Sequence, residues 1–261
     1  MHPVLFEIPF MGGLTIHSYG FMMAVGFIAA LLWIRYQSKQ VNLSVAKMTD
    51  LAFLMILAAI VGARVAFILV EWRFYLQNPL DIFKVWEGGL VFLGGLVGCI
   101  IVAYYYLKKH GLSFWKVADV FMPGVALGHG LGRVGCFFAG CCHGRQCDPN
   151  AWYGMVFSGK EGSLAPPGIP LYPTQLAEAL TEFLTFLFLA WKSQKKGFDG
   201  QILLLYLIIY SLIRIGIETF RGDLERGFVI PGLLSTSQFI SIVLIIFAVI
   251  VLIYRKGRSS K

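Results

Sequence analysis

The chain has 261 residues, of which 57% are hydrophobic and 14% are charged, and its mean hydropathy is +0.73. Soluble globular domains carry about 25% charged residues, so this composition excludes an ordinary soluble domain. The net charge of +8 does not indicate nucleic-acid binding, because no nucleic-acid motif accompanies the positive residues. We therefore expect an all-α, polytopic membrane protein whose residues 1–261 form one domain.

Seven apolar stretches reach the length of about 20 residues that a helix needs to cross a bilayer. They cover residues 18–36, 49–70, 89–107, 117–134, 174–191, 201–217 and 235–254. The third stretch contains Gly94 and Gly95, and the fourth contains Pro123. Such residues are tolerated where helices pack closely against one another, so these two helices are predicted to lie inside a bundle.

Lysine and arginine are concentrated in every second connection between these stretches. The enriched segments lie at the end of the first, third, fifth and seventh stretches or directly after them, and they hold Arg35, Lys39, Lys47, Lys108, Lys109, Lys116, Lys192, Lys195, Lys196, Arg255, Lys256, Arg258 and Lys261. Positive residues mark the cytoplasmic side, which predicts that the N-terminus is outside and the C-terminus is cytoplasmic. Residues near 135–172 are then predicted to form an ordered loop subdomain on the outer side.

Three arginines, Arg64, Arg133 and Arg214, lie within or at the outer ends of the apolar stretches. An arginine inside a membrane is costly unless it has a partner or faces a cavity, so each is a candidate for function. Glu218 follows Arg214 by four residues and is expected on the same helical face. Guanidinium groups suit bidentate binding of phosphate. The residues therefore predict a membrane cavity that binds an anionic group such as a phospholipid head.

Cysteines gather in and after the glycine-rich segment 128–145. Cys136, Cys141, Cys142 and Cys147 have a spacing that matches no standard zinc pattern. We expect no metal ion and no cofactor. A disulfide that includes Cys147 is an open alternative if the loop faces an oxidising compartment, and so is a metal or redox site.

Short motifs along nearly the whole chain resemble, in order, those of bacterial prolipoprotein diacylglyceryl transferases. They are His17-Ser-Tyr19-Gly20, Gly62-Ala-Arg64, Val85 through Leu90 with Gly94-Gly95-Leu96, Gly132-Arg133-Val-Gly135 through Gly140, Gly144-Arg145, Tyr172-Pro173-Thr174-Gln175-Leu176 with Glu178, and Tyr210, Arg214, Glu218 and Arg221. Each motif is weak alone, but their occurrence in this order is a specific signal.

The resemblance implies an enzyme that needs no cofactor and works in the bacterial inner (plasma) membrane. It would transfer the diacylglyceryl group of phosphatidylglycerol to the lipobox cysteine in the signal peptide of a prolipoprotein. A thioether would form and glycerol phosphate would leave. The partners implied are phosphatidylglycerol, prolipoprotein signal peptides and the lipid bilayer, with no nucleic acid.

The same resemblance implies roles for particular residues. Arg133 and Arg214 would bind the phosphate, and Tyr19 and Tyr210 would shape the catalytic site. The residues expected to support substrate binding are Arg64, Cys136, Gly144, Glu218 and Arg221.

Two positions depart from the family pattern. Cys136 stands where the signature commonly has asparagine, which indicates a subgroup, and Leu93 stands where members often carry histidine, a candidate base. Leucine transfers no proton, so there are three alternatives: another group is the base, the acceptor thiol ionises unaided, or this chain has lost the activity. We expect Cys136 to be a small filler beside Arg133, with a reactive thiol as the alternative.

Other functions fit the same residues. A membrane protein that binds or transports lipids would also use arginines and interrupted helices. A transferase with another lipid or acceptor is a further alternative.

Overall fold

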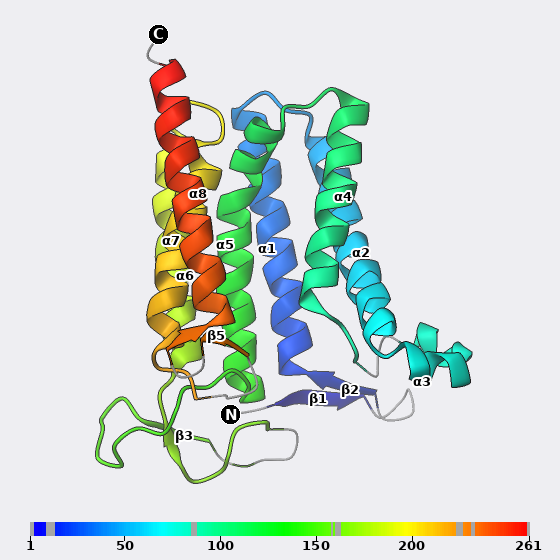
Figure 1. Ribbon diagram of the computed structural model, residues 1–261, viewed down its shortest axis with the longest axis vertical. Coiled ribbons are helices and arrows are strands. Elements are labelled where there is room, and N and C mark those ends of the chain that lie inside the picture. Colours follow the sequence, from blue (N-terminus) through cyan, green and yellow to red (C-terminus); the bar gives the residue numbers. More distant parts are fainter. Residues whose placement is uncertain are drawn as a thin grey trace. The chain divides into compact units, whose positions relative to one another are not determined.

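The computed structural model describes residues 3–8, 14–84, 88–157, 159, 163–222, 227–230 and 233–259 (Figure 1). Most of these residues are helical, and five helices are long and apolar enough to cross a membrane. They are α1 (Ser18–Gln40), α2 (Val45–Val70), α4 (Phe92–His110), α7 (Gln201–Glu218) and α8, whose candidate span is Thr236–Arg258 within the helix Thr236–Ser259. Large apolar side chains on their surfaces, such as Leu57, Ile100 and Ile250, are about 60% exposed, as expected for helices solvated by lipid. The protein is therefore a helical membrane protein.

Two more helices, α5 (Phe114–Ala139) and α6 (Thr174–Ser193), coincide with the remaining predicted spans. They are not among the five apolar helices, and α6 buries the carboxylates of Glu178 and Glu182. The predicted third span also differs in its start, since α4 begins at Phe92 rather than at residue 89. Gly88 and Gly89 have φ angles of 92° and 73°, which a right-handed helix does not allow.

The chain divides into two compact units. The smaller unit comprises residues 34–117 and contains α2, α3 (Trp72–Gln77), a 3₁₀ helix (Pro79–Phe83) and α4. In it α2 and α4 pack closely, because a Cβ atom added to Gly62 would collide with the carbonyl of Gly94 and one added to Gly98 would meet Ala58 O at 2.5 Å. Small residues allow this approach, and the glycines of the third predicted span are explained by it.

The larger unit comprises residues 1–33 and 118–261. Within it α6, α7 and α8 run side by side (Figure 1), and Ala126, Leu189, Ile202 and Tyr206 join α5, α6 and α7 in one buried core. Short antiparallel hairpins pair β1 (Val4–Ile8) with β2 (Leu14–His17), β3 (Met155–Val156) with β4 (Pro170–Leu171), and β5 (Phe228–Ile230) with β6 (Leu234–Ser235). In this unit β1, β2, β3 and β5 lie at the opposite end from the C-terminus of α8 (Figure 1).

Asp119 of α5 holds the start of α7. Its carboxylate is 3% exposed and accepts hydrogen bonds from the backbone N–H groups of Gly200, Ile202 and Leu203, at 2.8, 2.9 and 3.1 Å. These amides are among those that a helix N-terminus leaves without intrahelical partners, and a negative charge there is favourable. Lys196 Nζ completes the arrangement at 3.0 Å from Asp119 Oδ2.

Replacement of Asp119 by Asn is expected to lower the free energy of unfolding by about 3 kcal/mol, because a buried charge pair loses one partner. Burial lowers the pKa of Lys196, but the hydrogen bonds to Asp199 and Asp119 outweigh burial and raise the pKa above its usual value. The contribution of Lys196 is therefore fully present below the pKa that it has in the unfolded chain, and it is lost as the pH rises through the raised pKa of the folded protein. Thermal unfolding of the detergent-solubilised protein at neutral pH measures the effect.

Asp199→Asn is the matched control for this prediction. Asp199 Oδ1 also contacts Lys196, at 2.7 Å, but its side chain is 42% exposed, so we expect a change below about 1 kcal/mol. Equal losses in the two variants would show that Asp119 does not cap α7 in the way described.

Candidate functional site

Charged side chains of three helices meet inside the larger unit. His129 and Arg133 lie one turn apart on α5, Glu178 and Glu182 one turn apart on α6, and Arg214 and Glu218 one turn apart on α7. The side chains of Glu178 and Glu182 are 2% and 0% exposed, and those of Arg133 and Arg214 are 15% and 12% exposed. We call these six residues the charged cluster.

Glu178 is the centre of the charged cluster. Its Oε1 atom lies 3.1 Å from Arg133 Nη2, 3.8 Å from Arg214 Nη1 and 3.8 Å from His129 Nε2. A single carboxylate thus brings the two predicted phosphate-binding arginines together from two different helices. Removing one partner from such a buried set leaves an uncompensated charge, so the arrangement is sensitive to single substitutions.

His129 connects Arg133 to the second carboxylate. Arg133 Nε donates a hydrogen bond to His129 Nε2 at 3.1 Å, which places the imidazole proton on Nδ1. From Nδ1 the ring donates to Glu182 Oε1, also at 3.1 Å. Carboxylate, imidazole and guanidinium therefore form one chain of contacts that fixes the orientation of Arg133.

Arg214 is held by the carboxylate expected from the sequence. Its Nη2 atom lies 3.0 Å from Glu218 Oε2, one turn further along α7, which confirms that the two share a helical face. Its buried Nη1 atom forms no hydrogen bond among the described residues, although it lies within ion-pair distance of Glu178. Tyr210 lies next to the charged cluster, with its ring centroid 5.6 Å from that of His129.

The loop after α5 forms hydrogen bonds with residues at the start of α6 and near the end of α7. Gly144 N donates to Tyr172 O at 2.9 Å, and Gly144 also pairs as a β-bridge with Arg221. A Cβ atom on Gly144 would lie 2.5 Å from Tyr172 Cβ and 2.8 Å from Phe220 O, so only glycine fits there. Thr174 Oγ1 and Gln175 Nε2 donate to the carbonyls of Cys142 and Cys141, at 3.0 and 2.8 Å.

Three cysteines of this region come together. The Sγ atoms of Cys136, Cys141 and Cys142 lie within 4.8 Å of one another, and all five cysteines of the chain are free thiols in the structure. Hydrogen bonds from Cys136 and Cys141 lower the pKa of Cys142, and the positive charges of Arg221 and Arg133 act in the same direction. The pKa of Cys141 is raised, mainly by its hydrogen bond with Cys136 and next by its hydrogen bond with Cys142. These hydrogen bonds and charges therefore stabilise the ionised form of Cys142, whereas its burial opposes ionisation.

Tyr19 lies beside these thiols. It is within electrostatic range of Cys136, Cys141, Cys142 and Arg133, and it lines a cavity of about 460 Å³. The residues that line this cavity are Pro3, His17, Tyr19, Gly20, Ala139, Cys141 and Leu164. Most of its surface is apolar, as a cavity that accepts acyl chains or an apolar peptide requires.

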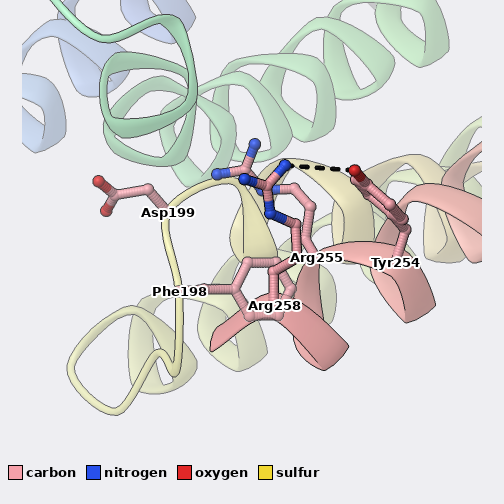
Figure 2. A pocket seen from close by; sticks show the side chains of 5 residues that line it. All are labelled: Phe198, Asp199, Tyr254, Arg255 and Arg258. Atoms are coloured by element: carbon pink, nitrogen blue, oxygen red, sulfur yellow. Dashed lines mark hydrogen bonds between the residues drawn. The ribbon is translucent and has the colours of Figure 1, made fainter. Parts of the chain in front are cut away.

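A second cavity, of about 480 Å³, contains no residue of the charged cluster. Figure 2 shows its lining side chains, Phe198, Asp199, Tyr254, Arg255 and Arg258, around the last turns of α8, where Arg258 Nη1 donates to Tyr254 Oη at 3.2 Å. This pocket belongs to the end of the larger unit where Asp119 and Lys196 meet α7.

Arg64 is the one predicted site residue among those described that belongs to the smaller unit. It is 7% exposed and donates to the carbonyls of Ile82, Gly88 and Asp81, at 3.0, 2.8 and 2.6 Å. Its guanidinium also lies 5.4 Å from the centroid of the Tyr75 ring. These contacts hold the segment between α3 and α4, whose residues 85–87 fall outside the described part of the chain.

Sequence reasoning missed His129 and Glu182, and it treated Glu178 only as part of a motif. A signal was present, because His129 and Arg133, and likewise Glu178 and Glu182, are separated by four residues within apolar stretches. Ionisable residues at that spacing share one helical face, and inside a membrane they require partners.

The structure thus defines a helical membrane protein with two arginines held by carboxylates in a buried site. The model of the prolipoprotein diacylglyceryl transferase family matches residues 3–254, and the chain belongs to this family. It is 36% identical over 249 residues to phosphatidylglycerol–prolipoprotein diacylglyceryl transferase 2 of Clostridium perfringens, which covers 95% of this chain and 94% of the relative. It is 38% identical over 251 residues to the enzyme of Clostridium tetani, with 96% of each chain covered. The enzyme of Bacillus velezensis is 32% identical over 264 residues, covering 100% of this chain and 95% of the relative.

Proposed function

We propose that this protein transfers the diacylglyceryl group of phosphatidylglycerol to the lipobox cysteine thiol of prolipoproteins. The relatives in Clostridium and Bacillus are named for phosphatidylglycerol and prolipoprotein as substrates, and the similarity extends over nearly the whole chain. The observation that carries the proposal is the placement of Arg133 and Arg214 on one buried carboxylate, Glu178.

The reaction needs positive charge at the leaving group. The acceptor sulfur attacks the glyceryl carbon that bears the phosphate, the carbon–oxygen bond breaks, and its electron pair stays on the departing glycerol phosphate. Donors aimed at the growing charge lower this barrier most when they are held in place beforehand. Arg133 is held by Glu178 and His129, and Arg214 by Glu218 and Glu178, which leaves other guanidinium N–H groups for the phosphate.

Our proposal also gives roles to the remaining predicted residues. Tyr210 borders the charged cluster, and Tyr19 lines the apolar cavity beside the thiols. Both are proposed to shape the catalytic site. Residues proposed to support substrate binding are Arg64, Cys136, Gly144, Glu218 and Arg221, and residues 1–261 are proposed to act as one transferase domain.

A transfer assay tests this function. Purified protein is incubated with phosphatidylglycerol carrying a labelled acyl chain and with a lipobox peptide, and the peptide is analysed by mass spectrometry. We expect a peptide that has gained a diacylglyceryl group through a thioether, together with free glycerol phosphate. A peptide with serine in place of the cysteine is the control and should remain unmodified. Failure to modify the cysteine peptide by protein that is folded and in lipid would contradict the proposal.

The proposed placement is the bacterial inner membrane, with seven spans, an outer N-terminus and a cytoplasmic C-terminus. Long helices at all seven predicted spans and the sorting of lysine and arginine support it. The charged cluster and the loop near residues 135–172 would then face the outer side, where the lipobox cysteine of an exported prolipoprotein is presented.

Reporter fusions test this orientation. Alkaline phosphatase, which is active only outside the cytoplasm, is fused after residue 160 or, as the matched control, after residue 195 between α6 and α7. We expect activity from the first fusion and none from the second, because the second connection is rich in lysine. The reverse pattern would invert the topology and place the charged cluster on the wrong side for the reaction.

A further inference from the structure

The function proposed above gives no role to Cys141 and Cys142, and it gives Cys136 only a supporting one. Cys136 is buried on the last turn of α5, and the other two follow directly after the helix ends. Their three Sγ atoms lie within 4.8 Å of one another. Three thiols at this separation are close enough to share one metal ion, because tetrahedral zinc with bonds of about 2.3 Å holds its sulfurs about 3.8 Å apart.

The backbone that carries two of these thiols is held in place. Gln175 Nε2 donates to Cys141 O at 2.8 Å, and Thr174 Oγ1 donates to Cys142 O at 3.0 Å. Cys142 has a φ of 58°, a left-handed conformation that a residue other than glycine seldom adopts. This conformation turns the backbone so that two adjacent cysteines contribute to the same group of thiols. Ligands positioned in this way lose little freedom when they bind an ion.

The charges around the cluster also suit a thiolate-bound ion. Zinc with three thiolates carries a net charge of −1, and burial of that charge requires positive neighbours. Arg221 and Arg133 both act electrostatically on Cys142. A fourth protein ligand is not needed, since zinc sites that perform chemistry keep one position open for water or substrate.

We propose that Cys136, Cys141 and Cys142 bind a zinc ion whose fourth position takes the acceptor cysteine of the prolipoprotein as a thiolate. This inference rests on the transferase function proposed above. It gives a source for the nucleophile, because a thiol bound to zinc is deprotonated without the help of a protein base. Cys141 also lines the apolar cavity of about 460 Å³, through which the acceptor would reach the ion.

The reaction then balances as follows. Each of the three protein thiols loses a proton to solvent when zinc binds, and the acceptor thiol loses its own on entering the fourth position, because a thiol coordinated to zinc is deprotonated. The zinc-bound sulfur attacks the glyceryl carbon, the carbon–oxygen bond breaks, and glycerol phosphate leaves beside Arg133 and Arg214. The product is a neutral thioether, a weaker ligand for zinc than a thiolate, so it leaves the ion.

Metal analysis and spectroscopy test the site apart from activity. Protein purified with a phosphine reductant is expected to contain about one zinc per chain by elemental mass spectrometry. Substitution of zinc by Co²⁺ should give the absorption of tetrahedral cobalt with sulfur ligands. A lipobox peptide should shift these bands, whereas the same peptide with serine in place of cysteine should not.

Single substitutions Cys136→Ala, Cys141→Ala and Cys142→Ala are expected to lose the zinc. Cys99→Ala is the matched control, because Cys99 lies on α4 in the smaller unit and should leave the metal content unchanged. At pH 7 only about 3% of a free thiol with a pKa near 8.5 is ionised, so the zinc-free variants should transfer about 30-fold more slowly.

The outcomes separate this inference from the proposed function. Wild-type protein that transfers the lipid but holds no zinc, or that holds a disulfide between two of these cysteines, would overturn the zinc site and leave the function intact. Transfer at the wild-type rate by zinc-free variants would overturn its role in the reaction. Zinc binding by a protein that modifies no lipobox peptide would overturn the transferase function, and with it the role of the ion.

Discussion

Arg133→Lys is expected to lower kcat/KM for diacylglyceryl transfer by about 100-fold or more, and Arg133→Ala by about 1000-fold, as for the loss of a donor that stabilises developing charge. Lysine keeps the positive charge but lacks the planar set of N–H donors. In the structure Arg133 uses Nη2 toward Glu178 and Nε toward His129. One ammonium group cannot keep both contacts and also bind a phosphate.

Transfer of a labelled acyl chain from phosphatidylglycerol to a lipobox peptide measures this effect in purified protein. Arg258→Lys is the matched control, because Arg258 contacts Tyr254 at the far end of α8 and should retain the wild-type rate (Figure 2). Wild-type kcat/KM in Arg133→Ala, at equal protein levels, would remove Arg133 from the catalytic site.

Glu178→Ala is expected to abolish measurable transfer and to lower the free energy of unfolding by about 3–5 kcal/mol. Glu178 is 2% exposed and has Arg133, Arg214 and His129 within 3.1 to 3.8 Å of one oxygen atom. Its removal would leave the buried guanidinium groups of Arg133 and Arg214 with fewer negatively charged partners. Transfer assays and thermal unfolding in detergent measure the two losses together.

Leu180→Ala is the control for Glu178→Ala, since Leu180 lies on the same helix and is 60% exposed. It should change both quantities little. The double substitution Arg133→Met with Glu178→Met then separates stability from catalysis. Replacing both buried charges by apolar side chains is expected to restore much of the stability, because neither charge is left alone, but no activity. Wild-type stability and activity in Glu178→Ala would show that this carboxylate does not organise the arginines.

The sequence alone predicted the helices well, because their main determinant is local. Each of the seven apolar stretches falls on a helix, and the predicted starts at residues 18, 174 and 201 are the starts of α1, α6 and α7. Burial of the backbone in lipid requires helices of about this length, so hydropathy is sufficient to find them. The pairing of Arg214 with Glu218 was also predictable, since residues four apart on a helix are neighbours.

Contacts between helices were decided only by the tertiary structure. Glu178 contacts Arg133, which lies 45 residues earlier in the sequence. Asp119 contacts Gly200 at the start of α7, more than 80 residues later in the sequence. Such contacts depend on how each helix is rotated about its axis and how closely it packs, which hydropathy does not specify. The same holds for Cys136, Cys141 and Cys142. Their spacing matches no standard zinc pattern, and their sulfurs converge because α5 ends and the chain turns back at Cys142. The sequence determined the helices and the family, whereas packing determined which carboxylates hold the arginines and which thiols meet.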